Sequence, residues 1–362
     1  MIKIVDRYII QELLSPFIFG IISFSSILAG STILIPLMQE AAKFDIPISQ
    51  VIQLFVYQVP GIIVFTFPMS MLLATILVFG RMNTDLEIIA FRAAGINFFR
   101  LIVPVVAVGL LISLMTIWFN ESIVPKANNS ATNLLTVIKN KDKPTLKQNL
   151  NITEYDTEGK PSRIINIVEI DKGILKQATV LEYQKGELIR AIKATEGKWR
   201  DDGAWEFYKG TMHNFTLSDR RKAIVMDFEK EVINININPL DIKNREKQIE
   251  EMNAKELNNR IKLSKRTGQN YKNDLVRYHL KFAVPFASLI FSILGASIGL
   301  RPHRSTSAIG LGISLVIVIL YYVLLGVGLG IAHIVPPIVA AWMPNLIVAL
   351  AAVLLLKKVA SQ

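Results

Sequence analysis

The sequence of 362 residues contains no cysteine, so disulfide bonds, thiolate metal sites and a cysteine nucleophile are excluded. It also contains no GxxxxGKS/T phosphate loop and no HExxH zinc motif, and its four histidines lie in four separate regions. Two long parts of the chain carry few charged side chains, and no Asp or Glu follows Asp274. These absences argue against an enzyme that hydrolyses nucleotides or that depends on zinc or on a thiol.

The scarcity of charge is confined to the two ends of the chain. Hydrophobic residues make up 51% of the sequence, and the mean hydropathy is +0.40. Only ten of the 40 Lys and Arg residues, and six of the 29 Asp and Glu residues, lie outside residues 120–281. This distribution predicts two membrane blocks that flank one polar domain. The net charge of +11 forms no basic stripe with interleaved aromatics, so we expect no nucleic-acid partner.

Six segments are long and apolar enough to cross a bilayer, because about 20 helical residues span about 30 Å of hydrocarbon. With an even number of spans both termini face the same side, and the Lys and Arg of the short loops place that side in the cytoplasm. We therefore predict an α-helical integral membrane protein with cytoplasmic termini and an external polar domain. The expected spans are residues 17–38, 52–80, 100–119, 282–300, 306–331 and 337–356.

A short amphipathic segment precedes the first span. It places Ile2, Val5, Ile9 and Leu13 on one helical face and its charged side chains on the other. This pattern predicts a helix that lies on the inner membrane surface. The apolar segment that follows is longer than a typical signal peptide core and lacks a convincing cleavage site, so we expect it to remain as a span.

The polar domain has a different hydrophobic period. Several segments approach strict alternation of apolar and polar residues and are separated by turn signals, which predicts about 100 residues of antiparallel β structure, roughly 145–240. A charged connector follows, with a helix expected over residues 252–263. The alternating segments are 187–195, 205–215 and 223–237.

The loop between the second and third spans predicts a short helix, residues 84–94. Thr84 and Glu87 have the spacing of a capping box, Asp85 adds negative charge at the helix start, and Gly95 suits a C-terminal stop. A helix this short is unstable alone in water, so we expect it to pack on another part of the protein.

The two faces of this helix suggest different neighbours. Leu86, Ile89 and Ala93 are expected to face the membrane domain, which leaves Glu87 and Arg92 for a partner. An ordinary surface connector is the alternative.

Two pairs of glycines have the spacing that allows close approach of helices. They are Gly295 with Gly299, and Gly326 with Gly330. Packing within the chain is the favoured interpretation, and dimerisation is the alternative.

Short motifs in both apolar blocks form a specific set. In the first block they are Arg7-Tyr8, Gly80-Arg81-Met82, Phe91-Arg92-Ala93-Ala94-Gly95 and Asn120-Glu121; in the second, Gly299-Leu300-Arg301, Tyr321-Tyr322, Pro336-Pro337 and Ala341-Trp342-Met343-Pro344-Asn345. As a set they resemble the LptF/LptG (YjgP/YjgQ) family, the permease subunits of the lipopolysaccharide-export ABC transporter.

The resemblance implies six spans, a periplasmic β-jellyroll between the third and fourth, and a cytoplasmic coupling helix between the second and third. The corresponding domains are residues 1–119, 120–273 and 274–362. It implies a second permease subunit in a homo- or heterodimer, a cytoplasmic ATPase dimer, periplasmic bridge proteins and lipopolysaccharide as partners, with no cofactor and no catalytic residue. Glu87 and Arg92 occupy coupling-helix positions of the family. The candidate ATPase-coupling residues are Thr84, Asp85, Glu87, Arg92 and Gly95.

The resemblance also implies that lipopolysaccharide enters between the first and fifth helices. Here the chain departs from the family, because no Lys or Arg lies between Arg7 and Lys43 to meet substrate phosphates. Arg277 and Lys281 are substitute candidates, with interfacial anchoring as the alternative. The other candidates for the substrate path are Phe17, Phe24, Leu28 and Ser31 on the first span and Ser314 and Tyr321 on the fifth.

The residues alone leave two other functions open. One is a membrane-bound glycolipid-modifying enzyme, although no carboxylate lies at the middle of a span where such chemistry or proton pumping would need it. The other is a membrane scaffold that works without ATP.

Overall fold

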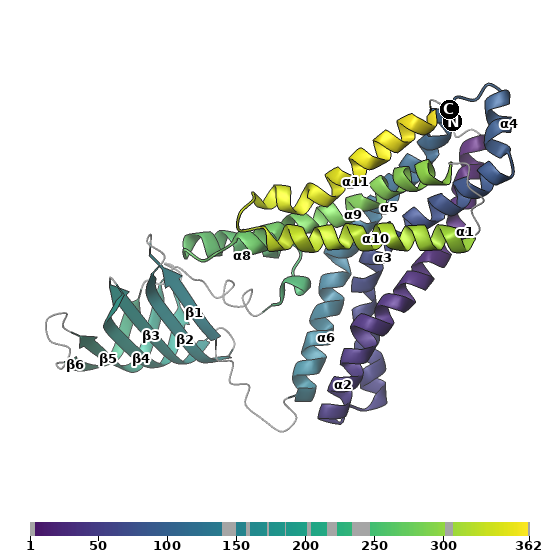
Figure 1. Ribbon diagram of the computed structural model, residues 1–362. Coiled ribbons are helices and arrows are strands. Elements are labelled where there is room, and N and C mark those ends of the chain that lie inside the picture. Colours follow the sequence, from purple (N-terminus) through teal and green to yellow (C-terminus); the bar gives the residue numbers. More distant parts are fainter. Residues whose placement is uncertain are drawn as a thin grey trace. The chain divides into compact units, whose positions relative to one another are not determined.

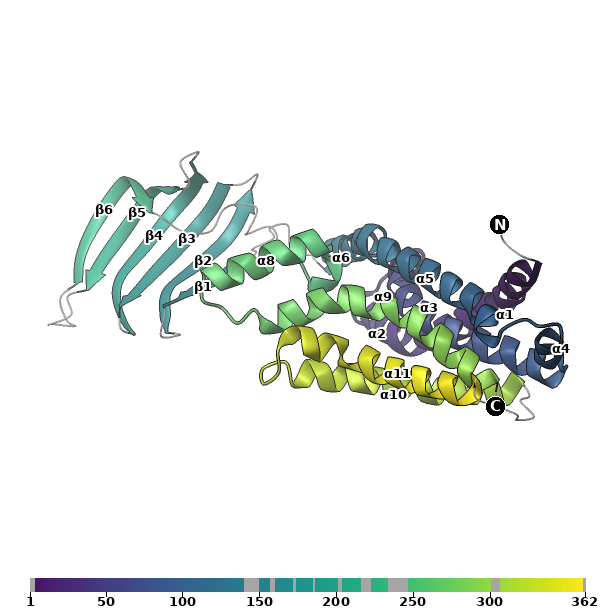
Figure 2. The same cartoon turned by 90° about the horizontal axis from the view of Figure 1, so that it is seen from above.

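The computed structural model describes residues 4–139, 150–156, 160–171, 174–184, 186–200, 204–215, 223–233, 247–300 and 307–360. The chain divides into two compact units (Figures 1 and 2). The helical unit comprises Met1–Ile138 and Lys272–Gln362, and the β unit comprises Lys139–Tyr271.

The predicted six spans are confirmed, since six of the described helices are long and apolar enough to cross a membrane. The first three helical stretches are longer than the sequence indicated, at 41, 37 and 40 residues. They are Ile4–Phe44, Ile48–Thr84 and Phe99–Ile138, and the first and third each contain more than one of the helices named below. The helices of this unit are α1 (Ile4–Leu28), the π-helix η1 (Ala29–Leu34), α2 (Ile35–Phe44), α3 (Ile48–Thr84), α4 (Glu87–Ala93), α5 (Phe98–Ser122), α6 (Val124–Lys139), α9 (Lys272–Gly299), α10 (Ser307–Gly330) and α11 (Pro337–Ala360).

The amphipathic N-terminal segment is part of the first long helix. α1 runs without a break from Ile4 through Pro16, whereas we expected a separate helix on the membrane surface. For the described residues the predicted apolar face is correct, because Ile9 and Leu13 are 0% and 2% exposed and Val5 is partly buried. Ile2 lies outside the described residues. Ile9 and Leu13 pack in a core with residues of α3 and α5, which holds α1 against the bundle.

Helix α6 belongs to the helical unit and not to the external domain. Ala131 and Ile138 are buried in a core with Ile33, Leu37 and Leu54 from η1, α2 and α3. The compact β unit therefore begins after this helix, later in the chain than the boundary at residue 120 that we expected.

Helices α3 and α9 are in backbone contact. A Cβ atom at Gly295 would lie 2.0 Å from Oγ1 of Thr75, and one at Gly299 would lie 2.8 Å from the backbone nitrogen of Gly80. For this glycine pair the predicted packing within the chain is confirmed. The second pair differs, because a Cβ built at Gly326 or at Gly330 meets no described atom within 4 Å apart from adjacent atoms of α10 itself.

The predicted antiparallel β domain is confirmed. The described strands pair in chain order as one antiparallel sheet, without the crossovers of the two-sheet jellyroll that the resemblance implied. The strands are followed by a 3-10 turn, η2 (Ile249–Glu251), and by the predicted connector helix, α8 (Ala254–Arg266). A capping box of Asn253 and Glu256 forms the start of α8. The strands are β1 (Leu150–Tyr155), β2 (Pro161–Asp171), β3 (Ile174–Gln184), β4 (Glu187–Trp199), β5 (Trp205–Phe215) and β6 (Ala223–Ile233).

One face of the sheet carries an apolar core, which we call the interior face. Gln177 and Lys209 have positive φ values of 51° and 48°, and the alternation of buried side chains along β3 and β5 changes there, from Leu175 to Ala178 and from Phe207 to Met212. Leu263 of α8 joins this core. Its other buried residues are Ile165, Ile167, Leu175, Ala178, Val180, Ile192, Ala194, Trp205, Phe207, Met212 and Ile233.

Candidate functional site

The connection from α3 to α4 differs from the predicted capping box. Thr84 ends α3, where its Oγ1 donates to the carbonyl of Gly80 at 2.9 Å. Leu86, with φ +61°, is the residue before α4, and Asp85 lies in the turn between the helices. The capping box is therefore wrong, because Thr84 and Glu87 belong to two different helices.

The end of α4 agrees with the sequence. Gly95 has φ +79°, and its N–H donates to the carbonyl of Arg92 at 3.0 Å. The N–H of Ile96 donates to the carbonyl of Phe91 at 3.0 Å. These two bonds form a Schellman motif, so the predicted glycine stop is confirmed.

The faces of α4 are rotated from the prediction. Ile88 is 5% exposed and Phe91 packs partly buried against the bundle core. The residues expected to pack there, Leu86, Ile89 and Ala93, are exposed, with Leu86 at 61% and Ile89 at 59%. Shifting the packed face by one residue rotates it by about 100°. α4 therefore turns an apolar surface away from its own chain.

Four side chains join α1, α3 and α4, and we call them the Arg81 cluster. Tyr8 Oη donates to Glu87 Oε2 at 2.8 Å. Arg81 Nη2 donates to Tyr8 Oη at 3.3 Å and forms an ion pair with Glu12 Oε2 at 2.7 Å. Tyr8 and Glu12 are four residues apart, so both reach the cluster from one face of α1.

A second ion pair ties α1 to α5. Arg100 Nη2 lies 2.6 Å from Asp6 Oδ2, and the Asp6 side chain is 14% exposed. Together with the Arg81 cluster, this pair bonds the first turns of α1 to the end of α3, the start of α4 and the start of α5.

A cleft of about 780 Å³ lies beside the Arg81 cluster. Helices α1, α3 and α10 line it, so residues of the first and fifth spans face the same space. Glu12 and Arg81 belong both to the cluster and to its lining. The lining residues are Gln11, Glu12, Ser15, Pro16, Ile76, Leu77, Val78, Arg81, Thr84, Asp85 and Gly310.

Three of the predicted path residues are buried inside the helical unit. Phe24 is 5% exposed, Ser314 is 0% and Tyr321 is 1%. Tyr321 Oη donates to Asn345 Oδ1 at 2.9 Å, and Ser314 Oγ donates to the carbonyl of Leu311 at 2.8 Å. In this structure these three side chains stabilise the bundle.

The other path residues of the first span are more accessible. Phe17 is half-buried beside Phe67, with ring centroids 6.0 Å apart, and Leu28 is half-buried. Ser31 is exposed in the π-helix η1 and donates to the carbonyl of Ile27 at 3.1 Å. Phe24, Tyr321 and, partly buried, Leu28 thus belong to one apolar core of the bundle, whereas Phe17 packs against another.

The two basic candidates at the start of α9 differ in exposure. Lys281 Nζ lies 3.4 Å from Glu121 Oε1, and the lysine side chain is 11% exposed. Asn120 Nδ2 donates to the carbonyl of Lys281 at 3.4 Å, the position that Pro285 leaves without an α-helical donor. Arg277 is exposed, so it is the more accessible cation of the two.

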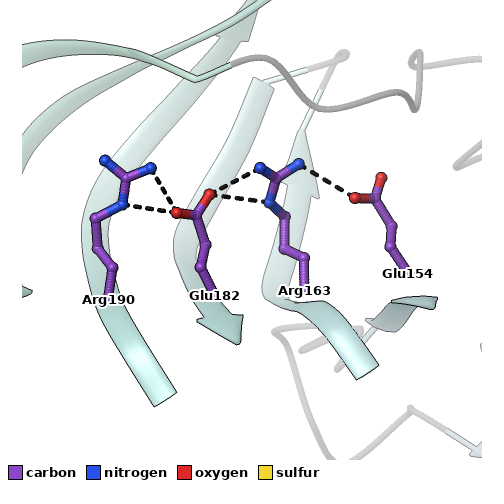
Figure 3. Close-up of polar contacts among 4 residues, drawn as sticks. All are labelled: Glu154, Arg163, Glu182 and Arg190. Atoms are coloured by element: carbon purple, nitrogen blue, oxygen red, sulfur yellow. Dashed lines mark hydrogen bonds and ion pairs between the residues drawn. The ribbon is translucent and has the colours of Figure 1, made fainter. Parts of the chain in front are cut away.

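A row of four charged side chains crosses strands β1 to β4, and we call it the charged row (Figure 3). Arg163 donates from Nη1 to Glu154 Oε2 at 3.1 Å and from Nη2 to Glu182 Oε1 at 2.8 Å. Arg190 Nε donates to the other oxygen of Glu182 at 2.7 Å. Each residue is paired in register with the next, so donors and acceptors alternate across the sheet.

The charged row lies on the interior face. Along each strand the row residue is two positions from a core residue, so both point the same way. Arg163 precedes Ile165, Glu182 follows Val180, and Arg190 precedes Ile192 in this manner. On the interior face, the charged row therefore lies directly beside the apolar core.

An acidic group on the opposite face of the sheet is strongly paired. Glu206 lies between the core residues Trp205 and Phe207 and so points away from them. Its hydrogen bonds with Lys230 Nζ, at 2.8 Å, and with Tyr208 Oη lower the pKa of the Glu206 carboxyl. The same bond raises the pKa of Lys230.

Metal chemistry finds no support in the part of the chain that the structure describes. Within it, no group of three or more His, Cys, Asp or Glu side chains could hold a metal ion.

Over residues 7–358, the sequence matches the family described as lipopolysaccharide export system permease LptF/LptG. The chain belongs to this family. No curated protein matches it. Membership makes the chain a multi-pass inner-membrane transport subunit and not an enzyme by itself, in agreement with its six apolar helices and inserted sheet.

Sequence reasoning missed the Arg81 cluster and the charged row. Tyr8 and Glu12 have a helical spacing that places them on one face of α1, which was a usable signal. Their partners Arg81 and Glu87 lie more than 65 residues later, and no local pattern predicts such a pairing.

Proposed function

We propose that the chain is the permease subunit of an ABC transporter that extracts lipopolysaccharide, a lipid-A-type glycolipid, from the outer leaflet of the inner membrane. It passes this lipid to a periplasmic bridge. The energy comes from ATP hydrolysis by a separate ATPase dimer, because the sequence has no phosphate loop of its own. Membership of the export permease family and the inserted β unit support this assignment.

The orientation follows from the basic residues of the short loops. Both termini and α4 face the cytoplasm, and the β unit lies in the periplasm. Arg92 lies in α4, and Arg81 and Arg100 lie in the flanking helices, which agrees with the excess of Lys and Arg on the cytoplasmic side.

Helix α4 is the docking element for the ATPase. Its outward surface presents the exposed side chains Leu86, Ile89 and Arg92, which suits a partner with an apolar groove. Glu87, at the start of α4, accepts the bond from Tyr8 and so anchors the helix to α1. This Tyr8–Glu87 bond carries the proposal, because it connects the docking element to the first span.

The second permease subunit is expected to contact the open glycine face of α10. Gly326 and Gly330 leave room there for close approach of another helix. The exposed side chains Val316, Val323 and Val327 on the same helix provide apolar surface for that contact or for lipid.

The test is Tyr8→Phe, which removes the hydroxyl and keeps the ring. We expect the ATPase to co-purify normally while glycolipid release per ATP falls by up to about tenfold, the effect of losing one hydrogen bond of about 1.4 kcal/mol. Tyr57→Phe is the matched control, because that hydroxyl accepts a bond from Gln53 of its own helix and so joins no two helices by this bond. Unchanged coupling in Tyr8→Phe would show that the bond does not transmit force.

A further inference from the structure

Burying the four charged side chains of the charged row away from water is unfavourable, and a role in folding alone does not explain it. Glu154 and Glu182 are 8% and 7% exposed, although they lie at the edge of an apolar core. Replacing buried ion pairs by apolar side chains of similar volume is often neutral or stabilising, so the sheet does not need charges here in order to fold.

One oxygen of the row lacks a donor. Glu154 Oε2 accepts from Arg163, but Oε1 is buried and has no hydrogen-bond partner among the described residues. A buried acceptor without a donor is unfavourable by about 1–3 kcal/mol, and such groups are rare in folded proteins. The row therefore contains an acceptor that can still take a donor.

The composition of the row indicates the chemistry of that molecule. Two guanidinium groups and two carboxylates alternate on strands about 4.8 Å apart, with no net charge. Neighbouring hydroxyl groups, which both donate and accept, fit such an array better than a phosphate alone, which needs net positive charge. The Arg190 side chain is 36% exposed, so the row is accessible.

The side chains of the interior face indicate how such a ligand would be oriented on the sheet. Next to the row lie apolar residues such as Val180 and Ile192, and the far end of the core holds Trp199 and Trp205, whose rings are 5.3 Å apart. An amphiphile on this face would bury its chains on the apolar rows and place its polar end at the charged row.

We infer that the charged row binds the sugar headgroup of a glycolipid whose acyl chains lie on the interior face of the β unit. This inference rests on the proposed function for the class of lipid. It adds a polar recognition site, at which Glu154 accepts a sugar hydroxyl and Arg190 donates to one.

The test uses the full chain in phosphatidylcholine nanodiscs without an ATPase. A photo-crosslinking residue replaces Met226, which is 46% exposed on the interior face next to Met212. The same residue at Val225 is the positional control, because Val225 pairs with His213 on the opposite face. Lipid A, dephosphorylated lipid A and phosphatidylglycerol are added separately, and the captured lipid is measured by mass spectrometry.

The decisive variant replaces all four residues of the charged row by Met. We expect capture of both forms of lipid A at position 226 to fall about tenfold, while phosphatidylglycerol capture stays unchanged. The matched control is Glu206→Met with Lys230→Met, an ion pair on the other face, and it should alter neither.

Retention of lipid A capture in the fourfold variant would overturn the inference. So would a need for the phosphates, since the row would then not recognise sugar hydroxyls. If the fourfold variant loses every lipid, Glu154→Met on the edge strand β1 decides: selective loss of lipid A supports the inference, and no loss overturns it. Failure of the wild type to capture any lipid A would overturn the proposed substrate as well, which separates the two.

Discussion

The hydroxyl of Tyr8 donates a 2.8 Å hydrogen bond to Oε2 of Glu87, so α1 is bonded directly to the first residue of α4. Glu87 is 79 residues away from Tyr8 in sequence, and the bond fixes the start of a helix that has only seven residues. A helix of this length is not stable alone, so its position depends on such contacts.

The first prediction separates two roles of Glu87. Glu87→Gln keeps an acceptor for Tyr8 but removes the charge, whereas Glu87→Arg places a second cation beside Arg81. If Glu87 anchors α4 to α1, Glu87→Gln should retain most export and Glu87→Arg should lose it. Export assays with purified partner ATPase measure this. Equal loss in both variants would instead indicate that the charge itself contacts the ATPase.

The second prediction concerns orientation and uses the absence of cysteine. A single cysteine replacing Lys193, exposed on β4, should react with an impermeant thiol reagent in intact spheroplasts. One replacing Ile89, 59% exposed on α4, should react only after the membrane is opened. Labelling at residue 89 alone in intact spheroplasts would reverse the proposed orientation.

The third prediction compares the two glycine pairs. Gly295→Ala should destabilise the helical unit by about 1–3 kcal/mol, because the new methyl would meet Thr75 Oγ1 and the carbonyl of Leu72. Gly326→Ala is the control, since its Cβ position meets no described atom within 4 Å apart from adjacent atoms of α10 itself. Thermal unfolding in detergent gives both values. Equal stability of the two variants would contradict the close α3–α9 packing.

The fourth prediction is a pH dependence in the β unit. Lys230 and Tyr208 lower the pKa of the Glu206 carboxyl below its ordinary value of 4.5. A lowered folded-state pKa contributes stability above the unfolded-state value, and that stability is lost as pH falls through the folded-state pKa. Wild type should therefore exceed Glu206→Gln in stability at pH 7, and the difference should shrink below about pH 4.5. A constant difference across that range would exclude this contribution.

The six spans were predictable because the free energy of inserting a segment into the membrane depends on its own composition: apolar side chains favour insertion and charged side chains oppose it. The start of the first helix was not, since α1 includes Asp6 and Glu12. Their charges are paired with Arg100 and Arg81, which are remote in sequence. The length of this helix therefore depends on tertiary contacts.

The same distinction applies to α4 and to β6. The stop at Gly95 follows from its own backbone, whereas the positive φ of Leu86 depends on the path between two packed helices. In β6, alternation cannot assign faces where Ile224, Val225 and Met226 are all apolar. Only pairing with β5 shows that Met226 is on the interior face and Val225 on the other.

The π-helix η1 changes which side of the first span meets its neighbours. An i→i+5 turn holds one more residue than an α-helical turn, so the side chains after it are rotated by about 100° relative to an uninterrupted α-helix. Before η1, Phe24 packs in the core that contains α9 and α10; after it, Leu37 packs in the core that contains α6. The first span thus has a register shift at its middle, and deletion of one residue from Ala29–Leu34 would turn Leu37 away from its core while leaving Phe24 in place.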